Sequence, residues 1–379
     1  MARVRRITTA GTIALSRTQA TLALVGAGIT VPWPANRSAT SRSFSRTCSQ
    51  QPRCIGKLPL SSAAASPSDS TNPEQETPSL SDSVQRLREL LDEAGGSAVA
   101  LTGAGMSTDS GIPDYRGPRG SYSRGHKPMT HDEFLSSEAN RKRCSEGGSR
   151  DPYWARSTFG WSSFSKARPN DAHVALAALE AAGKVGGVIT QNVDGLHQKA
   201  GSRNVVDLHG RNDKVECMSC QSKSSRDVYQ AHLAQLNAAW MDRYSPEPAP
   251  GEAPSGGDPS VELTPDGDAN VEPGEYLGEF VVPACVKCGG VLKPTVVFFG
   301  DNIPRPRVEE TYRMVDESSL LVAAGSSLQV YSAFRLVKRA ADAGKTVVVV
   351  NLGDTRAERS GLDVLKVEGG VSSVLPLLL

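Results

Sequence analysis

The first 68 of the 379 residues contain no aspartate and no glutamate, although they carry nine arginine or lysine residues. A segment that is rich in Arg and Ser and lacks acid is typical of an organelle transit peptide. Two alternatives stay open, a disordered cytosolic tail and a secretory signal built on the apolar run ATLALVGAGITV. We expect residues 1–80 to be a transit peptide followed by a disordered linker.

Long hydrophobic runs are also lacking. No segment reaches the roughly 18 consecutive apolar residues that a transmembrane helix requires, so we expect no membrane span. Removing the nine positive charges of the leader from the formal net charge of +1 leaves −8 for residues 69–379. An acidic body of this kind argues against binding to a nucleic-acid backbone through bulk charge. We therefore expect neither nucleic acid nor membrane as a partner.

Cysteine is scarce, but four of the seven cysteines form two equally spaced pairs. Cys217-x-x-Cys220 and Cys285-x-x-Cys288 have 64 residues between them. Two such pairs match a tetrahedral four-thiolate zinc site, in which no coordination position stays open for catalysis. Disulfides are the alternative, but a reducing compartment disfavours them, and a redox motif would need only one pair. We predict one structural zinc ion bound by these four cysteines.

Continuous apolar runs alternate with helical patterns along most of the chain. This alternation is typical of a parallel sheet with helical crossovers, whose strands are covered on both faces. We predict strands within 97–105, 185–190, 204–210, 295–300, 319–325 and 345–353, and helices within 82–96, 171–184 and 329–344. The first helix would be capped by Asp82 or Ser83 and ended by Gly95, and the second would be capped by Asp171.

The stretch 212–292 breaks this pattern. It contains both cysteine pairs and, at about 243–275, a segment rich in Pro, Gly and acid. That composition is typical of a loop or disordered insertion rather than a core element. We expect an α/β fold in which residues 81–211 and 293–379 form a Rossmann-like parallel sheet with helices on both faces. A small zinc-binding module, residues 212–292, would be inserted into it.

A glycine-containing loop, LTGAGMSTDSGIPDYRG, follows the first predicted strand at residues 101–117. Gly103 and Gly105 would let the backbone approach a pyrophosphate closely, with free amides to bind its oxygens. The loop lacks the third glycine of the dehydrogenase fingerprint, because position 108 is Thr. This argues against an ordinary hydride-transfer enzyme. The segment Pro113 to Arg116 forms a second polar group beside the loop.

Polar side chains also follow the other predicted strands, and ligands of open α/β sheets bind beyond the strand ends. Each of these residues alone also fits a helix cap or a turn, but together with the glycine loop they predict a nucleotide crevice. They are Gln191, Asn192 and Asp194 in ITQNVDGLHQKAG, Ser326 and Ser327 in GSSLQV, and Asn351 in NLGD.

Two histidines lie near these strand ends. His209 ends the segment DLH just before the segment that contains the cysteine pairs. An imidazole that titrates near neutral pH is the natural general base for a sugar hydroxyl, so we predict this role for His209. His197 falls on the helix expected after Asp194, and we expect it to be structural.

The chain resembles the sirtuin family of NAD-dependent protein-lysine deacylases. The motifs that carry the resemblance are GAGMSTDSGIPDYRG, TQNVDGLH, LHG, CMSC, CVKCGG, VVFFGD, GSSLQV and NLG. They are long, correctly ordered and spread over residues 84–379. WARSTFGWSSFSKARPNDAH and SSLQVYSAFR look most like the class II, mitochondrial sirtuin 4 type branch. The resemblance implies a mitochondrial matrix location, with the plastid as the alternative.

The resemblance also implies residue roles. Asn192 and Asp194 would hold the nicotinamide carboxamide, and His209 would take a proton from the ribose hydroxyls after the acyl oxygen attacks C1′. The products would be free lysine, nicotinamide and O-acyl-ADP-ribose. Val297, Phe298 and Gly300 would form the wall against which an acyl-lysine protein substrate lies as an added strand. The implied NAD contacts are Gly103, Ala104, Gly105, Ser107, Ile112, Pro113, Asp114, Tyr115, Arg116, Gln191, Asn192, Val193, Asp194, His209, Gly325, Ser326, Ser327, Asn351, Leu352, Gly353 and Val371.

Three functions stay open from the sequence. They are lysine deacylation, mono-ADP-ribosyl transfer to protein, and NAD sensing by a catalytically weak binding protein. Tyr122 and Arg124 could bind a carboxylate on the acyl chain, although they also fit solvated loop positions. The insertion is longer than usual for the family, with an extra low-complexity piece at about 245–260. We expect a monomer.

Overall fold

The structure is a computed structural model that describes residues 79–118, 120–136, 153–244, 262–269 and 279–379. The expected transit peptide and most of the insertion at 243–275 lie outside the described residues. The described residues belong to one compact unit, Pro73–Leu379. Within them, no helix combines the length and apolar character needed to cross a bilayer.

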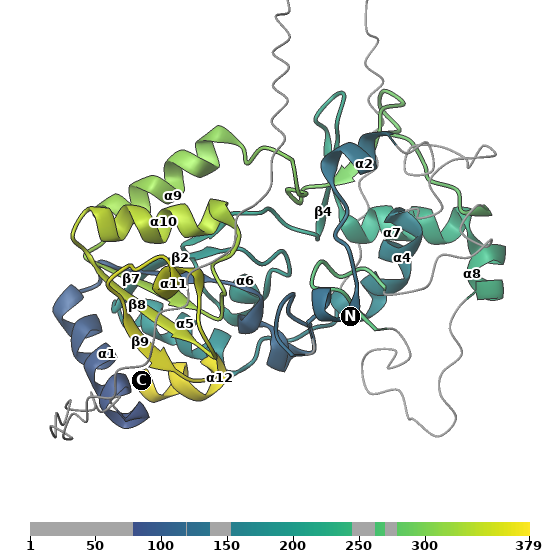
Figure 1. Cartoon of the computed structure of the whole chain (residues 1–379). Helices are drawn as coiled ribbons and strands as arrows, with labels where there is room; N and C mark the ends of the chain where they lie inside the picture. The colour runs from purple at the N-terminus through teal and green to yellow at the C-terminus, as the bar shows by residue number, and fades with distance from the viewer. Residues whose placement is uncertain (1–78, 119, 137–152, 245–261, 270–278) are drawn as a thin grey trace, which may run out of the picture. The chain divides into compact units, whose positions relative to one another are not determined.

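The larger of the two sheets in this unit has six strands and is covered by helices (Figure 1). Its strand order is β3-β2-β1-β7-β8-β9, and every neighbouring pair is parallel. The predicted strands of the sheet are therefore confirmed, and β9 is an addition that the sequence analysis did not predict. The strands are β1 (Ala98–Thr102), β2 (Val185–Thr190), β3 (Val205–Asp207), β7 (Leu320–Ala324), β8 (Thr346–Asn351) and β9 (Leu365–Glu368).

Helices cover both faces of this sheet, as predicted (Figure 1). Side chains alternate along each strand, so Ala98 and Ala100 pack on one face while Val99 and Leu101 pack on the other. The first face is covered by α1 (Leu80–Ala94), α5 (Asp171–Ala181) and α12 (Val371–Val374), and the second by α9 (Arg305–Glu317) and α10 (Tyr331–Asp342).

Two helix starts differ from the predictions. The side chain of Ser79, rather than Asp82 or Ser83, caps α1 by accepting from the Asp82 amide. Asn170, rather than Asp171, caps α5 and forms a capping box with His173. In both cases the cap lies upstream of the predicted residue, because several residues near each start could serve as caps. The end of α1 at Gly95, in the left-handed region with φ 54°, is as predicted.

A second, smaller sheet has the antiparallel order β5-β4-β6. Its core is aromatic and includes Phe134, Trp154 and Trp240. This core uses residues from 112–164 as well as from the cysteine-containing segment. The elements are β4 (Lys214–Cys217), β5 (Lys223–Ser225), β6 (Leu292–Pro294), α2 (His131–Ser136), α4 (Tyr153–Phe164), α7 (Arg226–Leu236) and α8 (Ala238–Tyr244).

The predicted strand at 295–300 is wrong. The regular strand β6 ends at Pro294, and the following residues bond to three different segments instead of one partner strand. The amide of Thr295 donates to Lys214 O, the amide of Val297 donates to His209 O, and Phe299 forms an isolated bridge with Thr130. This segment thus links the small sheet to the end of β3 (Val205–Asp207).

Candidate functional site

A cavity of about 970 Å³ lies where the loops after β1, β2, β7 and β8 meet the segment after β6. Ligands of parallel α/β sheets bind at this edge. Of all the residues predicted to contact NAD or substrate, only Gly103 and Gly353 do not line the cavity themselves. The residues predicted from the sequence therefore lie in one contiguous site.

The glycines after β1 also bring two cavity loops together. The amide of Gly103 donates to Ala324 O at 3.1 Å, and that of Gly105 donates to Gly325 O at 2.9 Å. These two amides are therefore not free to bind a pyrophosphate. A Cβ on Gly103 would lie 2.7 Å from the Cβ of Ser326, which is too close for any side chain. Glycine is required here because two cavity loops pack directly against each other.

Three polar side chains form a hydrogen-bonded chain at the end of β2. The Asn192 amide donates to Gly103 O and to Ser107 Oγ, both at 3.0 Å. The Ser107 hydroxyl in turn donates to Asp194 Oδ2 at 2.7 Å. Burial raises the pKa of Asp194, while hydrogen bonds from the Leu196 amide and Ser107 act in the opposite direction. Ser107 thus links Asn192 to Asp194, and all three residues line the cavity.

His209 lies between two fixed hydrogen-bond partners. Its Nδ1 is 3.1 Å from Gln191 O, and its Nε2 is 2.8 Å from Ser332 Oγ. A carbonyl can only accept, so Nδ1 carries the proton and the Nε2 lone pair is the basic position. Burial lowers the pKa of His209 to about 4, and Arg307 and Arg335 act in the same direction. The ring is therefore neutral at pH 7, with a lower pKa than the near-neutral value expected from sequence.

The insertion is not structureless throughout. Residues 262–269 form a turn that is closed by a bridge between Leu263 and Ala269 and contributes to the cavity wall. The Tyr115 hydroxyl donates to Asp266 Oδ1 at 2.5 Å. Burial raises the pKa of Asp268 to about 7. The prediction that the insertion contributes nothing to the core is thus wrong for this turn. The turn-forming sequence TPDG is the feature of the sequence that indicates it.

Tyr122 and Arg124, considered for carboxylate binding, take different positions. Tyr122 lines the cavity, with its ring centroid 5.3 Å from that of Tyr115. Arg124 does not line the cavity and forms an ion pair with Glu262. Tyr153 and Arg156 of α4 also line the cavity and were not predicted. The signal in the sequence was the charged Arg156 in a segment otherwise rich in aromatic residues.

The predicted substrate wall is held from behind by a buried lysine. Lys293 Nζ donates to Val296 O at 2.5 Å and to Asp301 Oδ2 at 3.0 Å. Its ammonium also lies 4.6 Å from the ring centroid of Phe298. Because these contacts span both ends of the segment 296–301, they fix the course of the wall that lines the cavity.

The four paired cysteines converge, as predicted. Their sulfur atoms all lie within 4.8 Å of one another, with Cys217 to Cys288 at 3.5 Å and Cys220 to Cys285 at 3.8 Å. Four thiolates at about 2.3 Å from a zinc ion would be about 3.8 Å apart, whereas a disulfide requires about 2.05 Å. The cluster is compatible with a tetrahedral metal and incompatible with disulfides.

The parallel sheet and the polar cavity at its carboxyl edge define a nucleotide-binding α/β protein of the Rossmann type. The model of the Sir2 family matches residues 103–332. The chain belongs to the Sir2 family, which confirms both the predicted family and the predicted fold.

The relatives with curated names agree with this membership. The chain is 44% identical to NAD-dependent protein deacetylase 2 of Bradyrhizobium diazoefficiens, over 79% of this chain and 97% of the relative. It is also 44% identical to NAD-dependent protein deacylase Sirt4 of Drosophila melanogaster, over 79% and 88% of the two chains. NAD-dependent protein deacylase SRT2 of Arabidopsis thaliana is 40% identical over 80% of this chain and 77% of its own length.

Solved structures give the same result. A structure of Sir2 with a p53 peptide and NAD+ is 29% identical, has a TM-score of 0.55, and is matched over 77% of this chain and 95% of its own. A structure of Sir2Tm bound to a propionylated peptide is 28% identical with a TM-score of 0.55, over the same shares of the two chains.

Proposed function

We propose that this protein is an NAD-dependent protein-lysine deacylase that transfers the acyl group to ADP-ribose. The observation that carries the proposal is the position of His209, a neutral base that lines the same cavity as Asn192 and Asp194. The names of the relatives, all NAD-dependent deacetylases or deacylases, support the same activity.

The contacts suggest what each residue does in the reaction. Both amide protons of Asn192 are used by Gly103 O and Ser107, so its Oδ1 is the atom left to accept from the nicotinamide carboxamide. Asp194, fixed by Ser107, would hold the carboxamide next to it. After nicotinamide leaves and the acyl oxygen attacks C1′, His209 Nε2 would accept the ribose proton, so that the 2′ oxygen can attack the acyl carbon.

The cysteine cluster would hold one zinc ion. The equal spacing of both pairs, the sulfur distances and the all-thiolate donor set fit zinc. Both knuckles also share one backbone pattern, in which the Gln221 amide donates to Cys217 O and the Gly289 amide donates to Cys285 O. Because the cluster supplies four ligands, the ion would stabilise the small sheet and take no part in the chemistry.

The remaining parts of the proposal concern partners and location. Acyl-lysine segments of other proteins would bind along Val297, Phe298 and Gly300, and the protein would act as a monomer.

We keep the division of the protein into a Rossmann-like domain, residues 81–211 and 293–379, and an inserted zinc-binding module, residues 212–292. The basic leader supports import into the mitochondrial matrix, with the plastid as alternative, and imaging of a fluorescent fusion of residues 1–80 would test it.

Mass spectrometry on the full chain tests the activity directly. The protein would be incubated with NAD and lysine peptides carrying acetyl, longer aliphatic, lipoyl, biotinyl, succinyl or branched carboxy-acyl groups. His209→Tyr is the inactive variant, and His232→Tyr, on α7 and away from the cavity, is the matched control.

We expect loss of one acyl class, with matching O-acyl-ADP-ribose, in the wild type and in His232→Tyr. We expect at least about a hundredfold less product from His209→Tyr, because a general base contributes about 10²- to 10⁴-fold. Intact peptides in all reactions, with ADP-ribose found on protein instead, would replace deacylation by ADP-ribosyl transfer. Intact peptides with bound, unconsumed NAD would favour the sensor function.

A further inference from the structure

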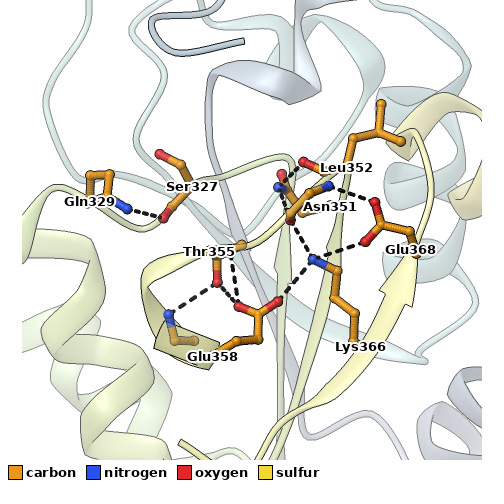
Figure 2. Close-up of polar contacts among 10 residues, drawn as sticks. Ser327, Gln329, Asn351, Leu352, Thr355, Glu358, Lys366 and Glu368 are labelled. Atoms are coloured by element: carbon orange, nitrogen blue, oxygen red, sulfur yellow. Dashed lines mark hydrogen bonds and ion pairs between the residues drawn. The ribbon is translucent and has the colours of Figure 1, made fainter. Parts of the chain in front are cut away.

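The turn at the end of β8 lines the cavity with Asn351, Leu352 and Asp354. Its shape depends on Gly353, which lies in the left-handed region with φ 73°. Both backbone groups of Gly353 are bound by side chains of the neighbouring strand β9, namely Lys366 and Glu368, which are labelled in Figure 2. Its amide donates to Glu368 Oε1 at 2.6 Å, and its carbonyl accepts from Lys366 Nζ at 2.6 Å.

Lys366 is the centre of this arrangement. Besides Gly353 O, its ammonium contacts Glu358 at 3.0 Å and Glu368 at 3.4 Å. The side chains of Lys366 and Glu358 are only 23% and 24% exposed, so their ion pair is partly shielded from solvent and salt. Glu368 is 60% exposed and forms the weaker of the two pairs.

Glu358 extends the arrangement to a second cavity loop. It forms a capping box with Thr355 at the start of α11 (Arg356–Arg359). From the first turn of α11, the Arg356 amide donates to Ser327 O at 3.0 Å, and its guanidinium donates to Gln329 O at 2.9 Å. Ser327 and Gln329, both labelled in Figure 2, lie in the loop after β7, and both also line the cavity. One lysine thus ties together the loops that follow two adjacent strands.

We propose that Lys366 is a positioning residue for the nucleoside part of NAD, acting through the turn 351–354 and not through contact with the ligand. The proposal rests on the proposed function, because it assumes that NAD occupies this cavity. Lys366 does not line the cavity. Its three contacts hold the turn in its ligand-binding shape before NAD binds. The free energy of ordering the turn therefore does not reduce the free energy of NAD binding. His209 and the substrate wall lie on other loops and keep their geometry without it.

The test compares four full-length variants with the wild type. Lys366→Met removes the ammonium but keeps most of the side-chain volume, and Lys366→Arg restores a cation. Lys338→Met is the matched control, since Lys338 forms an ion pair with Asp342 on the exposed face of α10. Glu368→Ala is a milder variant at an exposed position. ADP-ribose affinity is measured by calorimetry, and the KM for NAD, the KM for acyl peptide and kcat are measured by deacylation.

For Lys366→Met we expect about tenfold weaker ADP-ribose binding and about tenfold higher KM for NAD, because a charge-assisted contact is lost. The kcat and the peptide KM should change less than about twofold, and a purely structural role would not separate these constants. For Glu368→Ala we expect ADP-ribose binding to weaken and the KM for NAD to rise by about threefold. Lys366→Arg should recover part of the lost ADP-ribose affinity, and Lys338→Met should bind ADP-ribose and NAD like the wild type.

Wild-type ADP-ribose binding by both Lys366→Met and Glu368→Ala would overturn the inference while leaving the proposed function intact. A parallel loss of kcat and peptide affinity would also overturn it. If Lys366→Met does not fold, the ADP-ribose affinity of Glu368→Ala alone decides whether the inference stands. A wild-type protein that binds neither NAD nor ADP-ribose would instead refute the proposed function, and with it this inference.

Discussion

A pair of buried histidines predicts how stability depends on pH. His173 and His197 lie behind the cavity with ring centroids 4.9 Å apart, and both are at most 1% exposed. His197 Nε2 is 2.8 Å from Thr102 Oγ1, at the end of β1. Burial lowers the pKa of His173 to about 4 and that of His197 to about 3. Both rings are therefore neutral in the folded protein at every pH above about 5.

The sign of the effect follows from proton binding. The folded pKa of His197 lies below the unfolded value of about 6.5, so the unfolded chain binds more protons as the pH falls below about 6.5. Stability is then lost at about 1.4 kcal/mol per pH unit, which amounts to about 2 kcal/mol for His197 between pH 7 and pH 5. Asp268, whose pKa is raised to about 7, acts in the opposite direction over this range. The pH dependence of wild-type stability alone therefore does not separate the contribution of His197 from that of Asp268.

The assay is urea unfolding of the wild type and His197→Gln at pH 7, 6 and 5, followed by tryptophan fluorescence. At pH 7 we expect the variant to be less stable, because glutamine packs less well beside His173. By pH 5 this difference should shrink or reverse by about 2 kcal/mol. Thr102→Val is the control, since it removes the hydrogen bond but leaves the imidazole buried, so its cost should stay nearly constant. A wild-type to His197→Gln difference that does not vary with pH would refute the reasoning.

Two further predictions concern the cysteine cluster and the substrate wall. Cys288→Ser should reduce bound zinc, measured by elemental analysis, and lower the thermal midpoint of the small sheet, because three ligands hold a structural zinc poorly; a variant with unchanged zinc content would contradict the site. Lys293→Met should raise the KM for acyl peptide several-fold while leaving the KM for NAD unchanged, since Lys293 supports only the wall. Equal increases of both KM values would show that Lys293 acts on the whole cavity.

The sequence could predict the elements that depend on simple periodicity. The strands β7 and β8 are apolar runs bounded by Gly and polar residues, and α10 presents apolar residues to one side only. Helix α4 could not be found in this way, because ten of its twelve residues are buried and no polar face marks it. The turn 262–269 was missed because its neighbouring composition indicates disorder, whereas its burial depends on long-range contacts such as Tyr115 with Asp266.

The site residues were predictable as a group because parallel strands end at one edge, but their chemical states were not. Burial and the neighbouring arginines lower the pKa of His209, and neither is visible in the segment DLHG. The same applies to the amides of Gly103 and Gly105, whose partners lie at the end of β7, more than two hundred residues away. Local sequence identifies which groups meet, whereas the protonation state of each group depends on what the fold packs around it.

The hydrogen bonds of the site also indicate how it can accept a ligand. Buried polar groups need partners, and here they bond to one another, as Gln191 Nε2 does with Ser326 Oγ at 2.8 Å. A nucleotide that bonds to these groups must therefore replace existing bonds, whereas Asn192 Oδ1 can accept a hydrogen bond without giving one up. The two bonds of His209 differ in this respect. The one to Gln191 O belongs to the backbone and persists, whereas the one to Ser332 Oγ can be released by rotation of a single side-chain torsion. In the proposed reaction, nucleotide binding can thus release Nε2 from Ser332 so that it acts as the base. The bond to Gln191 O keeps the proton on Nδ1 throughout.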